Sequence, residues 1–321
     1  MFGASSRTQK MNLEQETRRG YTISKEMKKV WALEMEILKK LLEVCEKHHL
    51  RAWADGGTLL GTVRDHGFMP WDDDIDIAML RDDYDKLVEV AREEFKPPFF
   101  FQNGYTDTFW NGFSKLRMDG TAGITRKSYR FNFHQGIFID IFPYDAIPEE
   151  AGASDQLNIK GKRMRLELFN YWGGDVSPCH PIELLTAIRD KWHVRLKGPR
   201  KIYKEMEDLY RQYKISDHRF VACSAFIYDL PHFKRDKHWY DETIYLPFED
   251  MMMPVPGGYD SILRTQYGDY MTPVHSGSYH GNFLALDTER SYKELLPTVR
   301  KEHRWDDWKH RWNMIKKITS L

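Results

Sequence analysis

The sequence predicts an α+β (α/β) fold in which a mixed sheet is flanked by helices, followed by a helical and loop-rich C-terminal part. Apolar residues from Val30 to Cys45 recur at steps of three and four, which is typical of an amphipathic helix. Up to about residue 150, short β-branched and aromatic runs separated by Gly and Pro alternate with helical patterns. This alternation indicates strands and helices that pack into one core.

The composition argues against several classes of protein. Lys and Arg together number 48, as do Asp and Glu, so the net charge gives no indication of a nucleic-acid partner. Cys45, Cys179 and Cys223 stand far apart and lack the spacing of a disulfide framework or a structural zinc site. The N-terminus lacks the apolar segment of a signal peptide, and no apolar run is long enough to span a bilayer. We therefore expect a cytoplasmic protein.

Three regions are predicted along the chain. Residues 1–20 are polar and unpatterned, as in a flexible arm. Residues 21–150 form the core, and residues 151–321 form a C-terminal helical lobe that could belong to the same domain. In chain order, the expected elements are a helix at 24–49, a strand at 51–54, a short helix at 58–64, a strand at 74–80, a helix at 82–95, strands at 99–102, 112–118 and 136–142, helices at 155–171, 181–196 and 199–213, a strand at 221–228, a Pro- and Gly-rich stretch at 247–273, and a terminal helix.

Aspartates crowd the start of the predicted strand at 74–80. Alternate side chains of a strand share a face, so Asp74 and Asp76 point the same way while Ile75 and Ile77 point into the core. Two carboxylates held about 7 Å apart on one strand face repel each other unless a cation lies between them. A divalent ion removes that repulsion, and Mg²⁺ (or Mn²⁺) suits a few carboxylates completed by water and phosphate oxygens.

A third aspartate, Asp140, lies in the apolar run GIFIDIFPYD. An unpaired carboxylate among Phe and Ile would be costly, so Asp140 should have a partner. A metal ion shared with Asp74 and Asp76 would be one, and an ion pair with an arginine such as Arg117 is the alternative. Asp72 lies two residues before Asp74, so its side chain could share the same strand face and join the cluster. Asp73 does not share that face, and we expect it in a solvated turn.

The motif Gly56-Gly57-Thr58 lies at a strand-to-helix turn, where backbone N–H groups and a helix N-terminus can hold a phosphate and where Thr58 can cap the helix. Glycine lets the backbone approach a ligand closely. A Gly-Gly pair alone is weak evidence for a function. Combined with Asp-x-Asp and a third strand aspartate, it predicts phosphoryl or nucleotidyl transfer by the two-metal route.

These segments together resemble the LicD family of phosphotransferases. The likeness covers roughly residues 30–285 and rests on GTLLG at 57–61, Arg64, PWDDDIDI at 70–77 and GIFIDIFP at 136–143, with PFE at 247–249, VPGGY at 255–259 and YGDY at 267–270. The resemblance implies a nucleotidyltransferase-type fold in which Asp74, Asp76 and Asp140 bind the metal and Gly56, Gly57 and Thr58 form the glycine turn. No cysteine-rich zinc insertion of the fukutin group is visible, which favours the bacterial, choline-type branch.

The resemblance also implies a reaction and its partners. A CDP-activated alcohol such as CDP-choline would give its phospho-alcohol to a hydroxyl of a cell-surface glycan, such as lipopolysaccharide or teichoic acid, and CMP would leave. Asp140 could take the hydroxyl proton. Arg64, Lys115 and Arg117 could clamp donor phosphates, although Lys and Arg are also common on surfaces. The donor alcohol stays open among choline, ethanolamine, glycerol and ribitol.

Other candidates have equally ordinary explanations. Trp71, before the acids, could form one wall of a choline site, as could the pairs 171–172 and 239–240, although such rings more often pack in a core. His275 and His280 could meet acceptor or donor, or be solvated or core histidines. The terminal segment WDDWKHRWNMIKK could rest on the inner face of a membrane where a lipid-linked acceptor is built, or be a packed basic helix.

Three other functions compete with phospho-alcohol transfer. A glycosyltransferase also uses Asp-x-Asp to hold a metal and a nucleotide-sugar. A nucleotidyltransferase that uses ATP or CTP would release pyrophosphate instead of CMP. A non-catalytic binding protein on the same fold would fail to bind Mg²⁺ or Mn²⁺.

Overall fold

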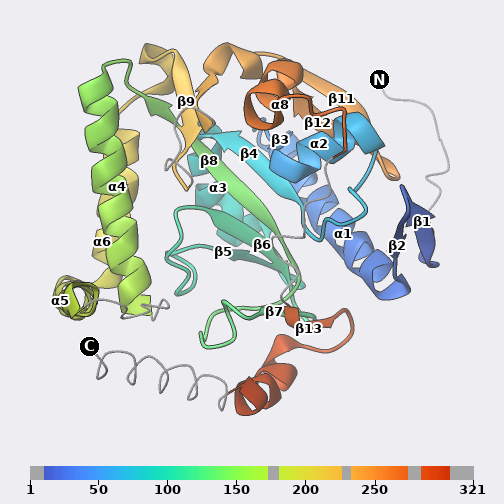
Figure 1. Ribbon diagram of the computed structural model, residues 1–321, viewed down its shortest axis with the longest axis horizontal. Coiled ribbons are helices and arrows are strands. Elements are labelled where there is room, and N and C mark those ends of the chain that lie inside the picture. Colours follow the sequence, from blue (N-terminus) through green and yellow to red (C-terminus); the bar gives the residue numbers. More distant parts are fainter. Residues whose placement is uncertain (1–10, 173–180, 226–232, 274–282, 304–321) are drawn as a thin grey trace.

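The computed structural model describes residues 11–172, 181–225, 233–273 and 283–303. A seven-stranded mixed sheet forms its centre (Figure 1). The strands are β3 (Trp53–Ala54), β4 (Asp76–Leu80), β5 (Phe99–Gln102), β6 (Ser114–Met118), β8 (Phe138–Ile147), β9 (Phe220–Cys223) and β10 (Arg235–Asp236). The predicted α+β class is confirmed.

Strand β8 organises this sheet. One edge of β8 pairs in parallel with β4, and the other edge pairs antiparallel with β6 along its first part and with β9 along its last part. All ten residues of β8 are buried, in keeping with an apolar run that has sheet partners on both sides. Strands β9 and β10 come from beyond residue 150 and still extend the same sheet.

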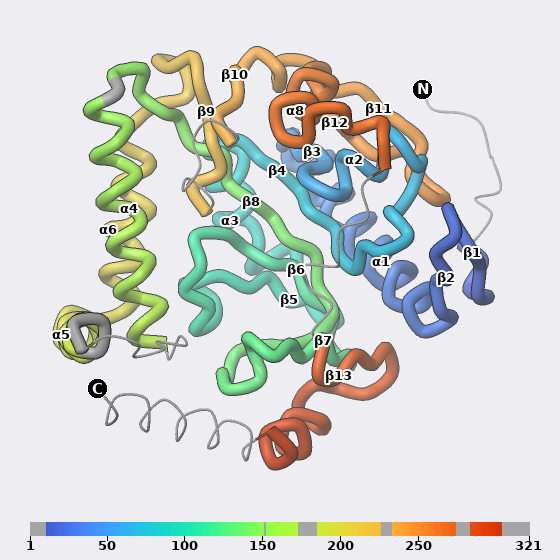
Figure 2. The backbone as a smooth tube through the Cα atoms, in the orientation of Figure 1, coloured from blue at the N-terminus to red at the C-terminus, as the bar shows by residue number. Residues whose placement is uncertain are grey.

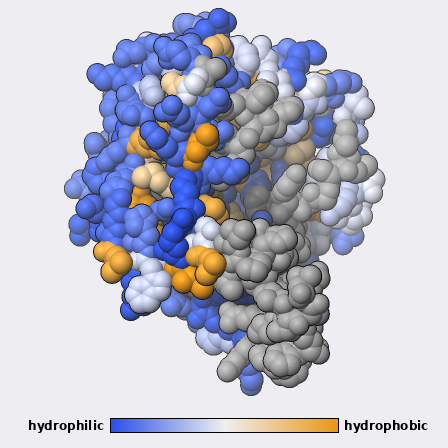
Figure 3. All heavy atoms as spheres, turned by 60° about the vertical axis from the view of Figure 1, so that its left-hand side comes forward, coloured by the Kyte–Doolittle hydropathy of each residue, from blue (hydrophilic) through white to orange (hydrophobic). Residues whose placement is uncertain are grey.

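Helices cover the sheet and one of its ends. Helices α1 and α3 contact the central strands, and α4, α5 and α6 pack against one another, with α4 and α6 side by side at the left in Figure 1. Figure 3 turns that side toward the viewer and shows hydrophobic side chains among mostly hydrophilic ones. The helices are α1 (Lys25–Lys47), α2 (Gly56–Asp65), α3 (Arg81–Glu94), α4 (Ala151–Trp172), α5 (Pro181–Lys197), α6 (Pro199–Arg211) and α8 (Tyr259–Tyr267), with 3-10 turns η1 (Ile215–Asp217) and η3 (Lys237–Tyr240).

Three two-stranded ribbons complete the described fold: β1 (Glu16–Arg18) with β2 (Tyr21–Ile23), β11 (Thr243–Phe248) with β12 (Met251–Pro256), and β7 (Ala122–Thr125) with β13 (Phe283–Asp287). The last of these ribbons brings distant parts of the chain together, because β7 and β13 are about 160 residues apart, whereas β11 and β12 form a local hairpin. Helix α8 also lies next to a distant segment: Figure 2 shows it over α2, although about two hundred residues separate the two helices. None of the described helices has both the length and the apolar character needed to cross a bilayer.

Local chemistry explains why α1 forms as predicted. Ser24 is its N-cap, and the Ser24 hydroxyl accepts a hydrogen bond from the N–H of Met27 at 3.1 Å. The apolar stripe of α1 is buried in the main core, where the rings of Trp31 and Phe68 stack with centroids 4.5 Å apart.

Several predicted boundaries differ from the structure. The strand predicted from Asp74 begins at Asp76, because its pairing with β8 starts there. The helix predicted from Thr58 begins at Gly56, with Asp55 at the N-cap. Residues 16–23, part of which was predicted as a loose arm, form a hairpin. The predicted strand at 221–228 ends at Cys223, and its last residues lie outside the described part of the chain, as does the terminal helix after residue 303.

Candidate active site

Two neighbouring strands bring the acids together. Asp76 at the start of β4 lies opposite Asp140 of β8 in the parallel register, and the N–H of Asp140 donates to the carbonyl of Ile75 at 2.8 Å. Carboxylate oxygens of Asp74, Asp76 and Asp140 all lie within 4.8 Å of one another. Asp74 precedes the strand, but its side chain still reaches the same point. The structure therefore brings the three predicted metal ligands to one place.

Burial and mutual repulsion both disfavour negative charge on this group of acids. The pKa of Asp76 is raised well above its ordinary value, chiefly because the group is removed from water and then because Asp74, Asp140 and Asp72 lie nearby. A divalent cation would relieve this repulsion. The donors are all carboxylate oxygens, the type that Mg²⁺ and Mn²⁺ prefer, so the residues present fit such an ion.

The partner of Asp140 is a lysine. Lys115, opposite Asp140 in the β6–β8 pairing, donates to Asp140 Oδ1, and its Nζ lies 3.5 Å from the centroid of the Phe138 ring. Burial lowers the pKa of Lys115, while Asp140 acts in the opposite direction. Arg117, the alternative partner, donates to Gln102 Oε1 at 2.5 Å and to the carbonyl of Gly136 at 2.6 Å, and the charge of Asp140 also acts on its pKa.

The glycine turn sits directly against the acids. Gly56 has a φ of +50°, and a Cβ there would lie 3.0 Å from Asp76 Oδ2. A Cβ on Gly57 would lie 2.6 Å from Asp72 Oδ2, which is closer than real contacts allow. A side chain at either position would displace one of these carboxylates, so the two glycines let the N-terminus of α2 approach the acids closely. Whether this turn also holds a phosphate stays a prediction.

Thr58 has a different role from the predicted cap. Its hydroxyl accepts a hydrogen bond from the backbone N–H of Asp76 at 2.8 Å, so it fixes the first residue of β4 to α2. Asp55 occupies the N-cap position instead and makes no side-chain cap bond.

Replacing Thr58 with Val is expected to destabilise the protein by about 1–3 kcal/mol, because it removes the acceptor of an inward-facing N–H. Thr58→Ser, which keeps the hydroxyl, is the matched control and should lose less than half as much. Chemical denaturation of both variants measures the difference. Equal losses would show that the methyl group, not the hydrogen bond, is what Thr58 supplies.

Arg64 and Trp71 are placed close to each other. The guanidinium of Arg64 lies 6.0 Å from the Trp71 ring centroid, and Arg64 Nη1 donates to the carbonyl of Tyr270 at 3.2 Å. Its Nη2 is buried and has no hydrogen-bond partner in the described part of the chain. This nitrogen is a spare donor, which is consistent with the predicted phosphate contact. One face of Trp71 is already near a cation, so its predicted role at a choline site stays untested.

Two buried acids near the site, Asp55 and Glu34, were not predicted from the sequence. Asp55 bonds to Arg235 Nη1 at 2.8 Å and accepts from the Tyr144 hydroxyl at 2.7 Å, which ties the start of α2 to β8 and β10. Glu34 of α1 is fully buried, and its pKa is raised well above normal, first by burial and then by the charge of Asp74. A signal existed for Glu34, since it lies on the apolar stripe three residues after Trp31.

The prediction of a solvated turn for Asp73 is wrong. Asp73 is buried, and its carboxylate forms a second close group with Asp72 and Asp74. The loop is held against α1 because Trp31 Nε1 donates to the carbonyl of Asp72 at 3.1 Å. His275 and His280 lie outside the described residues.

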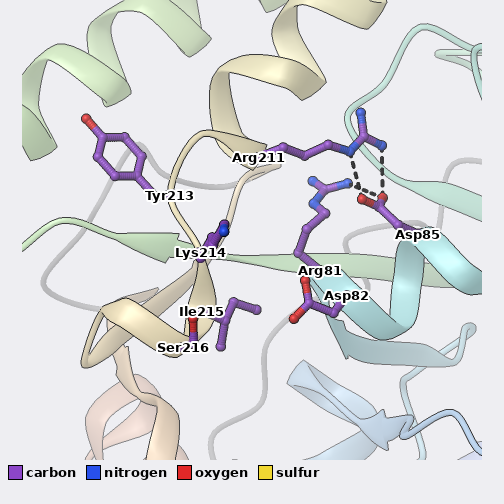
Figure 4. A pocket seen from close by; sticks show the side chains of 8 residues that line it. All are labelled: Arg81, Asp82, Asp85, Arg211, Tyr213, Lys214, Ile215 and Ser216. Atoms are coloured by element: carbon purple, nitrogen blue, oxygen red, sulfur yellow. Dashed lines mark hydrogen bonds and ion pairs between the residues drawn. The ribbon is translucent and has the colours of Figure 1, made fainter.

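The two cavities that stand out lie away from the acids. One, of about 280 Å³, lies beyond the far end of β4 and is lined by Arg81, Asp85 and Arg211 among others (Figure 4). Its guanidinium groups are already bonded, since Arg211 holds Asp85 at 2.7 and 2.9 Å and Arg81 holds Asp145 at 2.6 and 2.8 Å. Lys214 and Asp82 are the other charged residues of its lining.

The second cavity, of about 350 Å³, lies beside α4 and is lined by Trp110, Phe169 and Trp172, with Lys162 and Arg165. Trp172 stacks on Phe131 with centroids 4.3 Å apart and meets Phe109 at 5.8 Å. Lys115 Nζ lies 5.8 Å from the Phe109 ring, so this aromatic cluster extends toward Asp140. Of the other rings predicted for choline, Tyr240 is buried against Trp53.

A mixed sheet whose adjacent strands present carboxylates to the N-terminus of a glycine-opened helix is an arrangement suited to the class of proteins that transfer nucleotidyl or phosphoryl groups. Comparison with known proteins supports this class. The model of the family described as LicD/FKTN/FKRP, nucleotidyltransferase domain, matches residues 49–170, which include all three acids and the glycine turn. This stretch of the chain is similar to the LicD family.

Individual relatives are consistent with this. The chain is 29% identical over 249 residues to the lipopolysaccharide cholinephosphotransferase LicD of Haemophilus influenzae, covering 74% of this chain and 88% of that relative. Uncharacterised proteins of Rickettsia prowazekii and Rickettsia typhi are each 35% identical, over 74 residues (23% of this chain and 26% of the relative) and 64 residues (20% and 19%), respectively.

Proposed function

We propose that this protein is a metal-dependent phosphotransferase that moves phosphocholine, or a related phospho-alcohol, from a CDP-activated donor to a hydroxyl of a cell-surface glycan. The observation that carries the proposal is the meeting of Asp74, Asp76 and Asp140 beside the N-terminus of α2. The extended similarity to a lipopolysaccharide cholinephosphotransferase supports choline as the alcohol and lipopolysaccharide as the kind of acceptor. We expect the reaction to take place in the cytoplasm.

The residues have distinct parts in the proposed reaction. Asp74, Asp76 and Asp140 would hold Mg²⁺ or Mn²⁺, which when bound supplies positive charge against the donor phosphates. The N–H groups at the start of α2 and the spare nitrogen of Arg64 would orient the phosphates. A bond forms between the acceptor oxygen and the phosphorus that bears choline, the bond to the bridging oxygen breaks, and CMP leaves with that electron pair. Asp140 is the proposed acceptor of the hydroxyl proton.

A thermal-shift screen of CDP-alcohols with Mg²⁺ tests the donor. A donor present at a hundred times its dissociation constant should stabilise the protein by about 2.7 kcal/mol, or roughly 5 °C for a chain of this size. CDP-choline should give the largest shift, followed by measurable CMP release when a glycan acceptor is added. A shift with UDP-sugars alone would indicate a glycosyltransferase, and pyrophosphate release from ATP or CTP would indicate a nucleotidyltransferase.

The raised pKa of Asp76 gives a pH dependence with a definite sign. In the folded, metal-free protein Asp76 keeps its proton at pH values where the unfolded chain has lost it. The unfolding free energy should therefore fall as the pH rises above the ordinary aspartate range toward the raised pKa. Mg²⁺ binds the ionised form, so it should raise the melting temperature more at pH 8 than at pH 5. Melting curves with EDTA and with Mg²⁺ measure this, and a pH-independent effect of Mg²⁺ would contradict it.

A further inference from the structure

Helix α5 has an unusual distribution of side chains. Its buried face consists of Ala187, Asp190 and Val194, and Asp190 is fixed to α4 by Arg163 at 2.5 Å and by Asn170 at 2.8 Å. The face turned away from α4 is expected to be polar in an ordinary surface helix. Here the most exposed residues include large apolar ones: Leu185, Ile188, Trp192 and Leu196, with exposed fractions of 66%, 46%, 61% and 82%.

These four side chains form one stripe. At 3.6 residues per turn they fall within an arc of about 80°, opposite the buried face. Of the thirteen large apolar side chains that are exposed in the described chain, seven belong to α4 and α5, on the side that Figure 3 brings forward. Exposed apolar groups concentrated in this way mark a surface that meets a partner.

The charges around the stripe indicate what that partner is. Arg189 and Arg195 flank the stripe on its two sides, and Lys191 lies further round the helix; all three are exposed. The acid among residues 185–197, Asp190, is buried, so within this span the exposed surface of α5 carries basic but no acidic side chains. An apolar stripe with an interfacial tryptophan and flanking cations has the pattern of a helix that lies in the surface of an anionic bilayer.

A second copy of this chain fits the stripe less well. A twofold contact through α5 would bring the same surface against itself, so arginines would face arginines. An anionic lipid surface instead offers negative charge to both arginines, of which Arg189 also pairs with Asp190 at 3.0 Å.

We propose that the outward face of α5 (Leu185, Ile188, Trp192 and Leu196, flanked by Arg189 and Arg195) docks on an anionic phospholipid surface. The helix would lie in the plane of the headgroups, with the four apolar side chains entering the boundary of the acyl chains. This surface is distinct from the terminal basic segment, and it does not depend on the identity of the donor or the acceptor.

Sedimentation of the 321-residue chain with vesicles tests the proposal. Binding is expected to vesicles that contain phosphatidylglycerol, to weaken at high salt, and to be much weaker with phosphatidylcholine alone. Trp192→Ser or Leu196→Ser should lower the partition coefficient about tenfold. Arg195→Gln should lower it about fivefold for phosphatidylglycerol vesicles. Tyr245→Ser on β11, where the tyrosine is likewise 61% exposed, is the matched control and should bind as the unaltered protein does.

Several results would overturn the proposal. These are the absence of binding to phosphatidylglycerol vesicles, equal binding of the α5 variants, or equal binding to neutral vesicles. A dimer in analytical ultracentrifugation that Trp192→Ser dissociates would assign the face to a second copy instead. The assay contains neither donor nor acceptor, so its outcome is separate from that of the proposed reaction.

Discussion

Replacing Asp76 with Asn is expected to reduce Mg²⁺-dependent CMP release from CDP-choline by at least about a thousandfold, equivalent to about 4 kcal/mol of transition-state stabilisation. The change removes one negative charge from the group formed with Asp74 and Asp140 but keeps the shape of the side chain. The backbone bonds of Asp76 to Thr58 and Asp55 do not involve the carboxylate and should persist.

The kinetics of this variant should be measured with saturating donor over a series of Mg²⁺ concentrations. Asp155→Asn on α4 is the control, because Asp155 is an exposed acid outside the site. Its turnover should match that of the unaltered protein. Normal turnover in Asp76→Asn, with the same dependence on Mg²⁺, would remove the proposed role of the acids.

Replacing Lys115 with Met should destabilise the metal-free protein by about 3–5 kcal/mol, because Asp140 would be left buried without its lysine. Mg²⁺ should recover part of this loss, since a bound cation supplies positive charge at the same carboxylate. Denaturation curves with EDTA and with Mg²⁺ measure both effects.

Two further variants test the cause of the loss of stability expected for Lys115→Met. Lys127→Met changes an exposed lysine and should alter the unfolding free energy little. The double variant Lys115→Met, Asp140→Asn should lose less than the sum of the two single changes, because the two residues interact directly. A loss below about 1 kcal/mol for Lys115→Met, unaffected by Mg²⁺, would show that the ion pair is not what keeps Asp140 in place.

Local patterns in the sequence predict much of the fold. The periodicity of α1 and the apolar run of β8 each depend on neighbours within a few residues, and both elements form where expected. Alternation along each strand also predicts which face of its strand Asp76 or Asp140 points from. This alternation does not determine the order of the strands in the sheet, so only the structure shows that β4 pairs with β8.

Contacts between distant segments could not be predicted. A metal ion or, as the alternative, an arginine such as Arg117 was expected as the partner of Asp140, and the register of β6 on β8 places Lys115 opposite it. Asp55 finds Arg235 across 180 residues, and no local pattern links the two. Asp73 looked solvated because it lies between a turn and a strand, but packing of its loop against α1 buries it.

The central claim is that side chains 74, 76 and 140 bind one cation, and crystals soaked in Mn²⁺ test it most directly. The anomalous signal of manganese should give a peak about 2.1–2.2 Å from oxygens of Asp74, Asp76 and Asp140, and Asp76→Asn should abolish or weaken it. A map without a peak between these carboxylates at saturating Mn²⁺, or with the peak at other residues, would contradict the claim.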